Sequence, residues 1–158
     1  MYKTGIGQDS HRFQSEGKGA VVGGLCFDDA PPLDADSDGD VVFHAICNAI
    51  TSITHVPILG DLAIKMCHEK GIRDSHQYLA AALKTLKGYQ IEHIALTIEG
   101  QRPKFQKRSQ ELRQSVAAAV GIDSDQIGVT FTTGDGMTAF GRGEGLQCFC
   151  VISVKKIS

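Results

Sequence analysis

The chain has 158 residues, of which 42% are hydrophobic and 22% charged, a composition that predicts one compact domain spanning residues 1–158. Its formal net charge of −2, with scattered basic residues, gives no field for attracting nucleic acid, so we expect no such partner. We find no secretion signal and no run of membrane-spanning length, and we expect a cytoplasmic protein without membrane association. Five cysteines without CxxC spacing are expected to be reduced thiols of the core.

The first half of the chain predicts strands followed by helices. Segments 2–13 and 20–27 are rich in β-compatible residues and are expected to pair as an antiparallel hairpin. Residues 41–53 show helical spacing behind good capping residues, which should place His44 on a helix. A loop at 57–61 and a polar segment at 64–73 lead to a helix capped by Asp74 and Ser75 and running to about Lys87.

The second half alternates between the two kinds of element. A strand is predicted at 90–98, a helix at 104–120, and strands at 126–132 and 146–155, with an irregular glycine-rich connection between the last two. This succession predicts an α+β protein in which helices pack on one face of a sheet. The other face then needs cover, which predicts an oligomer.

Three residues are candidates for binding one metal ion. Asp9 and His11 are two apart in a predicted strand, so their side chains point to the same face. His44, one turn inside a helix, could supply a third ligand and leave a tetrahedral position open for chemistry. A capping or hydrogen-bonded Asp–His pair is the alternative interpretation.

The acidic run DSDGD at 36–40 also has two interpretations. Its three carboxylates could bind a hard cation as a fragment of a calcium loop, although the later glutamate of such a loop is missing. They could equally cap the following helix and interact with its dipole. Both roles can coexist.

The glycine-rich stretch 132–145 combines two threonine hydroxyls, Asp135, Arg142 and five glycines. This mixture suits the approach of backbone amides to phosphate oxygens, and a loose hairpin connection is the alternative. Arg102 and Lys104, on either side of a proline, could contact an anion or simply begin a solvated helix.

The motifs GIGQDSHRF, GGL, DSDGDVVFHAICNAI, LGDL, RDSHQYL, QRPK and GRGEG occur in this order, and with them the chain resembles the 2-C-methyl-D-erythritol 2,4-cyclodiphosphate synthase family over nearly its whole length. The resemblance implies an α+β homotrimer with an active site at each subunit interface and a central cavity. It implies a lyase of the non-mevalonate (MEP) pathway of isoprene biosynthesis. The 2-phosphate of 4-diphosphocytidyl-2-C-methyl-D-erythritol 2-phosphate would attack the β-phosphorus, giving the cyclic 2,4-diphosphate and CMP.

The resemblance also implies roles for single residues. Zinc would be held by Asp9, His11 and His44, and a second ion, Mg²⁺ or Mn²⁺, by Asp135. Asp36 and Thr133 stand at the catalytic positions. Contacts with the nucleotide-linked substrate are implied for Asp9, His11, Asp36, Ser37, Asp61, Gly100, Lys104, Thr132, Thr133, Asp135 and Arg142, and Arg142 with Glu144 would lie close to the central cavity.

Several positions depart from the family pattern. Asp36 stands where the family usually has a histidine that stabilises the transition state, and an anion there should repel phosphate. Asp135 replaces a glutamate and Asn48 a helix aspartate. The family's FPDTDP lid loop is not recognisable in MCHEKG, and GDGMTA replaces the usual residues after the two threonines.

Two other functions fit the same residues. A divergent trimer could bind isoprenoid diphosphates or other phosphates without turnover. A zinc-dependent phosphohydrolase could use the open metal position to activate water.

Overall fold

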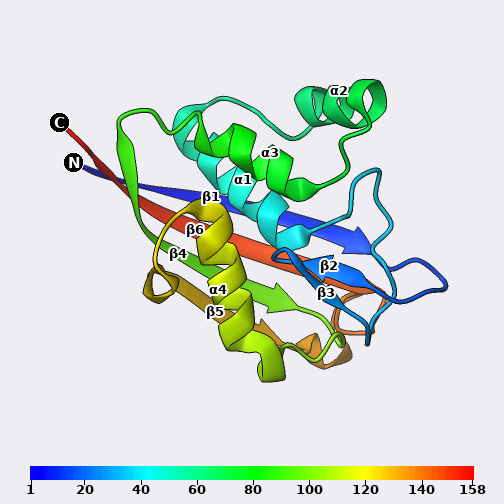
Figure 1. The fold of residues 1–158 in the computed structure, drawn as a ribbon. Coiled ribbons are helices and arrows are strands. Elements are labelled where there is room, and N and C mark those ends of the chain that lie inside the picture. The colour runs from blue at the N-terminus through cyan, green and yellow to red at the C-terminus, as the bar shows by residue number, and fades with distance from the viewer.

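A four-stranded mixed sheet is the framework of the protein, which a computed structural model describes over residues 1–158 (Figure 1). The strands lie in the order β1 (Tyr2–Arg12), β6 (Gly145–Lys156), β4 (Tyr89–Glu99) and β5 (Ile127–Thr132). Neighbouring strands are antiparallel except β4 and β5, which are parallel because the chain returns through the crossover helix α4 (Ser109–Val120).

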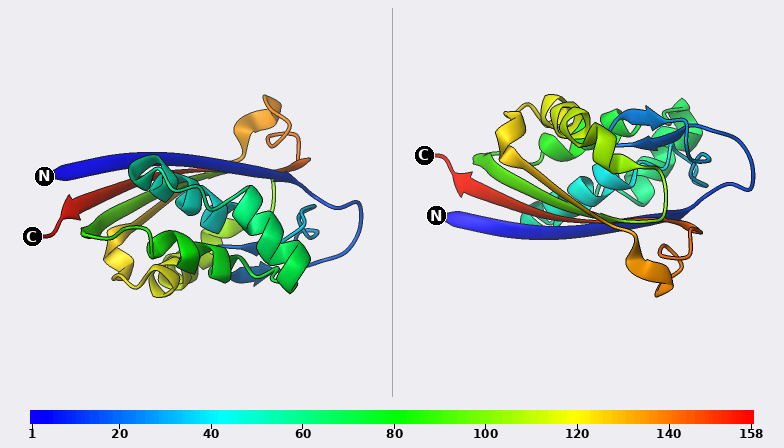
Figure 2. Two further views of the ribbon diagram at one scale, coloured as in Figure 1. Left: turned by 90° about the horizontal axis from the view of Figure 1, so that it is seen from above. Right: turned by 90° about the horizontal axis from the view of Figure 1, so that it is seen from below.

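The helices form a second layer on one face of this sheet (Figure 2). The layer contains α1 (Val41–Thr54), α3 (Ser75–Leu83) and α4, with α2 (Asp61–Lys70) at its edge. A core of 34 buried hydrophobic residues includes the side chains between the layers. The predicted α+β class, with helices on one face of a sheet, is confirmed. Three short 3-10 helices complete the structure: η1 (Phe105–Arg108), η2 (Ser124–Gln126) and η3 (Gly134–Gly136).

Two glycines of β1 allow α1 to lie directly on the sheet. A Cβ atom at Gly5 would be 2.3 Å from the carbonyl oxygen of Ala49, and one at Gly7 would be 2.2 Å from that of Ala45. Real Cβ atoms essentially never come so close to backbone atoms, so only glycine permits this contact. The backbone of α1 is thereby brought against β1 directly beside His44.

The opposite face of the sheet has no helix over it in this chain (Figure 2). Its apolar side chains are exposed: Ile6 is 61% exposed, Phe149 40% and Val151 37%. The side chains that alternate with them along β6, among them Cys148 and Cys150, are fully buried under the helices. The sheet therefore has one buried and one open face.

The predicted hairpin between segments 2–13 and 20–27 is wrong. Strand β1 pairs instead with β6, from the other end of the chain. Residues 20–27 fold back on themselves as β2 (Ala20–Val22) and β3 (Leu25–Phe27). The reason is the turn between them: Gly23 and Gly24 both have positive φ, at 59° and 80°, which a two-residue hairpin loop requires.

The polar segment before Asp74 contains a helix that the pattern did not predict. Helix α2 has no buried residue, so its sequence lacks the apolar stripe that marks a helix packed on a core. Helix α3 ends at Leu83, four residues before the predicted end near Lys87. None of the five cysteines forms a disulfide, but only Cys47, Cys148 and Cys150 lie in the core as expected, since Cys26 is exposed and Cys67 partly exposed. No helix of the structure is long and apolar enough to span a bilayer.

Candidate functional site

The candidate metal ligands lie on β1 and α1, which are in close contact at Gly5 and Gly7. Asp9 and His11 point from β1 toward the helix layer, on the same side as Gly5 and Gly7. His44 is the fourth residue of α1 and is only 6% exposed. Helix α1 begins where predicted because Asp40 accepts hydrogen bonds from the N–H groups of Val42 and Phe43, both 3.1 Å long.

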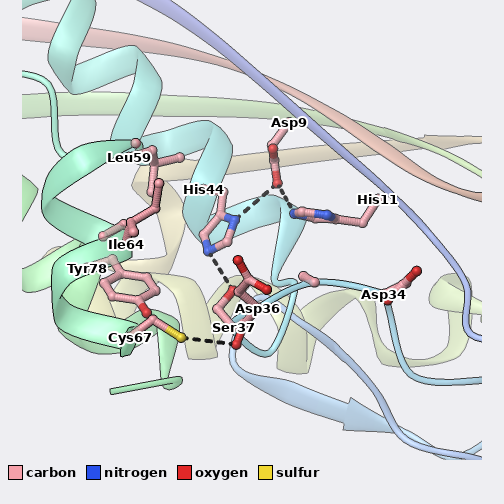
Figure 3. A pocket seen from close by; sticks show the side chains of 13 residues that line it. Asp9, His11, Asp34, Asp36, Ser37, His44, Leu59, Ile64, Cys67 and Tyr78 are labelled. Carbon is pink, nitrogen blue, oxygen red and sulfur yellow. Dashed lines mark hydrogen bonds and ion pairs between the residues drawn. The ribbon is translucent and has the colours of Figure 1, made fainter. Parts of the chain in front are cut away.

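The three side chains converge on one point (Figure 3). Oδ2 of Asp9 lies 3.0 Å from Nε2 of His11 and 3.1 Å from Nδ1 of His44. The three ligand atoms all lie within 4.8 Å of one another. Nε2 of His11 is buried, with the Asp9 carboxylate as its close polar neighbour. Since ligands about 2.1 Å from a tetrahedral ion lie roughly 3.4 Å apart, the arrangement fits a single ion such as Zn²⁺.

The charges of the three groups depend on one another. Burial alone would raise the pKa of Asp9, but hydrogen bonding and charge from His11 and His44 outweigh burial and lower that pKa below its usual 3.8. The Asp9 carboxylate in turn raises the pKa of His11, against the opposing effect of burial. A carboxylate shared by two imidazoles is thus kept ionised, which is the state that binds a cation.

A cavity of about 570 Å³ opens beside the cluster. Its walls come from β1, from the loop 34–37, from the first turn of α1 and from α2 and α3. The residues that line it are Asp9, His11, Asp34, Ala35, Asp36, Ser37, His44, Leu59, Gly60, Ala63, Ile64, Cys67 and Tyr78. The sequence motifs gave no role to Asp34, Cys67 or Tyr78, because none of them stands out from its neighbours by type or spacing. Helix α2 closes one side of this cavity, where the unrecognised lid sequence lies.

Asp36 and Ser37 lie at the mouth of the cavity with different surroundings. The Asp36 carboxylate is mostly exposed, and its Oδ2 lies 3.6 Å from Nε2 of His68 on α2. The thiol of Cys67 donates to the Asp36 carbonyl oxygen at 3.2 Å. Ser37 is buried, and its Oγ accepts the N–H of Gly39 at 3.1 Å. An imidazole is therefore present beside position 36, supplied by α2.

The acidic run DSDGD caps the following helix, as the capping interpretation predicts, through one of its members. Asp40 is fully buried and, besides capping α1, accepts the N–H groups of Gly23 and Gly24, both at 2.8 Å. Asp38 accepts the N–H of Ser75 at the start of α3, at 3.0 Å. The carboxylate of Asp36 makes no such bond and faces the cavity (Figure 3).

The remaining residues with implied roles lie outside this cavity. Gly100, Lys104, Thr132 and Thr133 lie at or just beyond the ends of the parallel strands β4 and β5, and the N–H of Gly100 donates to the Thr132 carbonyl at 3.0 Å. Asp135 has a positive φ of 48°, and its carboxylate accepts the Thr133 hydroxyl at 3.1 Å. The segment around η3 projects from the open face of the sheet (Figure 2).

Arg142 and Asp61 lie in two other places. Arg142 pairs with Glu144 at 3.1 Å, and Glu144 also lies 3.5 Å from Arg12. Asp61 begins α2 and is exposed, next to Gly60 in the cavity wall. One chain thus brings together the metal cluster, Asp36 and Ser37, and leaves the group at 100–104 and 132–135 separate.

Comparison with known proteins gives the family of the chain. A model of the YgbB family matches residues 2–155. The curated 2-C-methyl-D-erythritol 2,4-cyclodiphosphate synthase of Chlamydia felis is 52% identical, over 98% of this chain and 89% of its own length. The protein of the same name from Chlamydia trachomatis serovar D is 48% identical, over 98% and 88%.

Solved structures agree with this relationship. The bifunctional IspDF of Campylobacter jejuni superposes with a TM-score of 0.89 at 26% identity, and the match covers 100% of this chain and 43% of that longer one. A structure of 2C-methyl-D-erythritol-2,4-cyclodiphosphate synthase in a CDP-bound form gives 0.83 at 28% identity, over 97% of this chain and 100% of that one. The fold and site are those of an α+β protein with a candidate metal-binding cluster on the edge strand of its sheet. The chain belongs to the YgbB family, as the sequence motifs predicted.

Proposed function

We propose that the chain is a cyclodiphosphate-forming lyase of the MEP pathway, which converts 4-diphosphocytidyl-2-C-methyl-D-erythritol 2-phosphate to 2-C-methyl-D-erythritol 2,4-cyclodiphosphate and CMP. An oxygen of the 2-phosphate forms a bond with the β-phosphorus, and the bond from that phosphorus to the CMP oxygen breaks. The observation that carries the proposal is identity of about 50% over nearly the whole chain to relatives that bear this name, together with the intact Asp9–His11–His44 cluster.

We assign one zinc ion to Asp9, His11 and His44. Two neutral imidazoles and one carboxylate are a usual ligand set for catalytic Zn²⁺, and they leave one position open. When bound, the ion supplies positive charge that polarises a phosphate oxygen. The buried Nε2 of His11 supports this assignment, because it and Nδ1 of His44 both lie against the same oxygen of Asp9.

The chain's own residues at the mouth of the cavity orient the substrate phosphate. Ser37 keeps its hydroxyl proton available, because its oxygen already accepts the Gly39 N–H, and it can donate to a phosphate oxygen. Asp36 takes the position of the family histidine, and His68 stands 3.6 Å from it to offset its charge. Asp61, at the exposed start of α2, is assigned to the methylerythritol hydroxyls.

The second group of residues is assigned to the nucleotide half of the substrate. Gly100, Lys104, Thr132 and Thr133 would form the cytidine pocket, with Thr133 also touching the reacting phosphate and Arg142 a phosphate beyond it. Asp135 would hold Mg²⁺ or Mn²⁺, which binds through few carboxylates and the substrate's own phosphates. A CDP-bound form of a 28% identical structure supports a nucleotide site in this fold.

We propose that three copies of the chain assemble around the open face of the sheet. The exposed side chains of Ile6, Phe149 and Val151 support burial of this face. The assembly would also place the nucleotide-binding group of one copy beside the metal cluster of the next, since one chain keeps the two apart. Each 1–158 chain would act as one domain, in the cytoplasm, where its five thiols stay free.

The activity is tested by ³¹P NMR of the purified protein with the cytidylated substrate and Mg²⁺, before and after chelation of zinc. We expect CMP and a cyclic diphosphate before chelation and unchanged substrate after it. Inorganic phosphate or an open-chain product would show the phosphohydrolase instead, and binding without turnover in a zinc-loaded protein would show a binding protein. Light scattering on the same sample tests the assembly, where a mass of one or two chains would contradict the trimer.

A further inference from the structure

Behind the metal cluster, the second ring nitrogen of His44 is hydrogen-bonded to Ser75, which is hydrogen-bonded in turn to Asp38. Nε2 of His44 lies 2.9 Å from Oγ of Ser75. The Ser75 hydroxyl in turn makes a short hydrogen bond to Oδ1 of Asp38. Ser75 is fully buried, so these bonds are shielded from water. We propose that Asp38 and Ser75 are positioning residues that fix the tautomer and the ring orientation of His44, so that Nδ1 presents its lone pair to the metal.

The direction of these bonds follows from the number of protons available. A carboxylate can only accept hydrogen bonds, so the single hydroxyl proton of Ser75 is directed to Asp38. The oxygen of Ser75 can then only accept from His44, which requires a proton on Nε2. Nδ1 lies 3.1 Å from the Asp9 carboxylate, and a metal ion bound there would replace any proton on Nδ1 and leave the proton that Ser75 holds on Nε2. This is the form of histidine that binds a metal through Nδ1.

The two positioning residues are themselves fixed by backbone groups. Oδ2 of Asp38 accepts the N–H of Ser75 at 3.0 Å, and the N–H of Asp38 donates to the Arg73 carbonyl at 3.0 Å. Asp38 Oδ1 also accepts the N–H of Asp40, the residue that caps α1. The loop 36–40 and the first turn of α3 therefore form one rigid support behind the ring.

Ser37 is the competing partner, and its geometry is weaker. Its Oγ lies 3.5 Å from Nε2 of His44, at the limit of a hydrogen bond, compared with 2.9 Å for Ser75. Ser37 also lines the cavity, whereas Ser75 does not. The two serines thus have different roles: Ser37 faces the substrate cavity, and Ser75 holds the metal ligand His44.

The inference rests on the proposed metal site and goes beyond it, because neither residue touches metal or substrate. The negative charge of Asp38, acting on His44 through the hydroxyl of Ser75, increases the electron density of the imidazole and so strengthens its bond to a cation. Removal of such an outer partner typically weakens metal binding by 10–100-fold.

The first test follows the ring nitrogens of His44 by ¹⁵N NMR in the zinc-loaded chain. We expect the metal on Nδ1 and the proton on Nε2. Zinc on Nε2 would overturn the proposal. A chain that binds no zinc at Asp9, His11 and His44 would contradict the metal site on which the proposal rests, so the two failures are distinguishable.

The second test compares variants by zinc affinity, measured by chelator competition, with urea unfolding of the metal-free forms alongside. Ser75→Ala and Asp38→Asn should each weaken zinc binding by about 10–100-fold. Asp74→Ala is the matched control, because Asp74 caps the same helix through the His76 N–H at 2.9 Å without a bond to His44. It should lower stability and leave affinity unchanged. Affinity within twofold of the parent for Ser75→Ala, or an equal loss for Asp74→Ala, would overturn the proposal.

Discussion

Gly7→Ala tests whether the contact between α1 and β1 places the metal site. The added Cβ would lie 2.2 Å from the carbonyl oxygen of Ala45 and 2.3 Å from the amide nitrogen of Ala49. Ordinary contact begins near 3.4 Å, and both neighbours are helix backbone, which does not yield like a flexible side chain. Helix α1 must therefore move away from β1 by roughly 1 Å, because the interior is already close-packed.

The expected losses follow from this displacement. Overpacking of this kind costs about 1–3 kcal/mol of the free energy of unfolding. His44 moves with α1 while Asp9 and His11 stay on β1, so the three ligands no longer converge. A misplacement of about 1 Å in a reacting site can cost roughly 100-fold in rate. We expect a loss of that order in kcat/KM for CMP release, together with weaker zinc binding.

The assays are steady-state CMP release, chelator competition for zinc, and urea unfolding of the metal-free protein. Gly128→Ala is the control: it puts the same methyl group on β5, where φ is not positive and the nearest atom is Nε2 of the exposed His93 side chain at 3.3 Å. It should leave all three measurements nearly unchanged. If Gly7→Ala binds zinc and turns over substrate within twofold of the parent, the contact with β1 does not position His44.

Three further outcomes are expected. His44→Ala should lose zinc binding and CMP release together, and retention of either would remove His44 from the ligand set. Asp36→His should speed CMP release, because an imidazole replaces an anion beside the phosphate site; a variant no faster than the parent would indicate that His68 already offsets the charge. Native thiol titration should label Cys26 and Cys67 only, because the other three cysteines are fully buried. Burial also raises the pKa of Cys47 and Cys150 to about 12. Early labelling of a third thiol would contradict this packing.

Local signals were sufficient for most of the elements. The helix with His44 was predicted because its capping residue and apolar spacing lie within a few positions of each other, and the structure caps it with Asp40 as expected. The family also followed from motif order and is confirmed by the match over residues 2–155. The helix α2 was missed because no residue in it is buried, and helical periodicity is visible only where one face packs on a core.

Local sequence patterns were enough to identify the residue types of the metal cluster, the placement of Asp9 and His11 on one face of a strand, and the cap that begins α1. Three features became visible only in the folded chain: β1 pairs with the C-terminal strand β6, Asp38 and Ser75 lie behind His44, and His68 faces Asp36. The difference lies in the range of the interactions. Caps and side-chain alternation depend on neighbours a few residues away, whereas these contacts join residues at least 31 positions apart and form only when the layers pack.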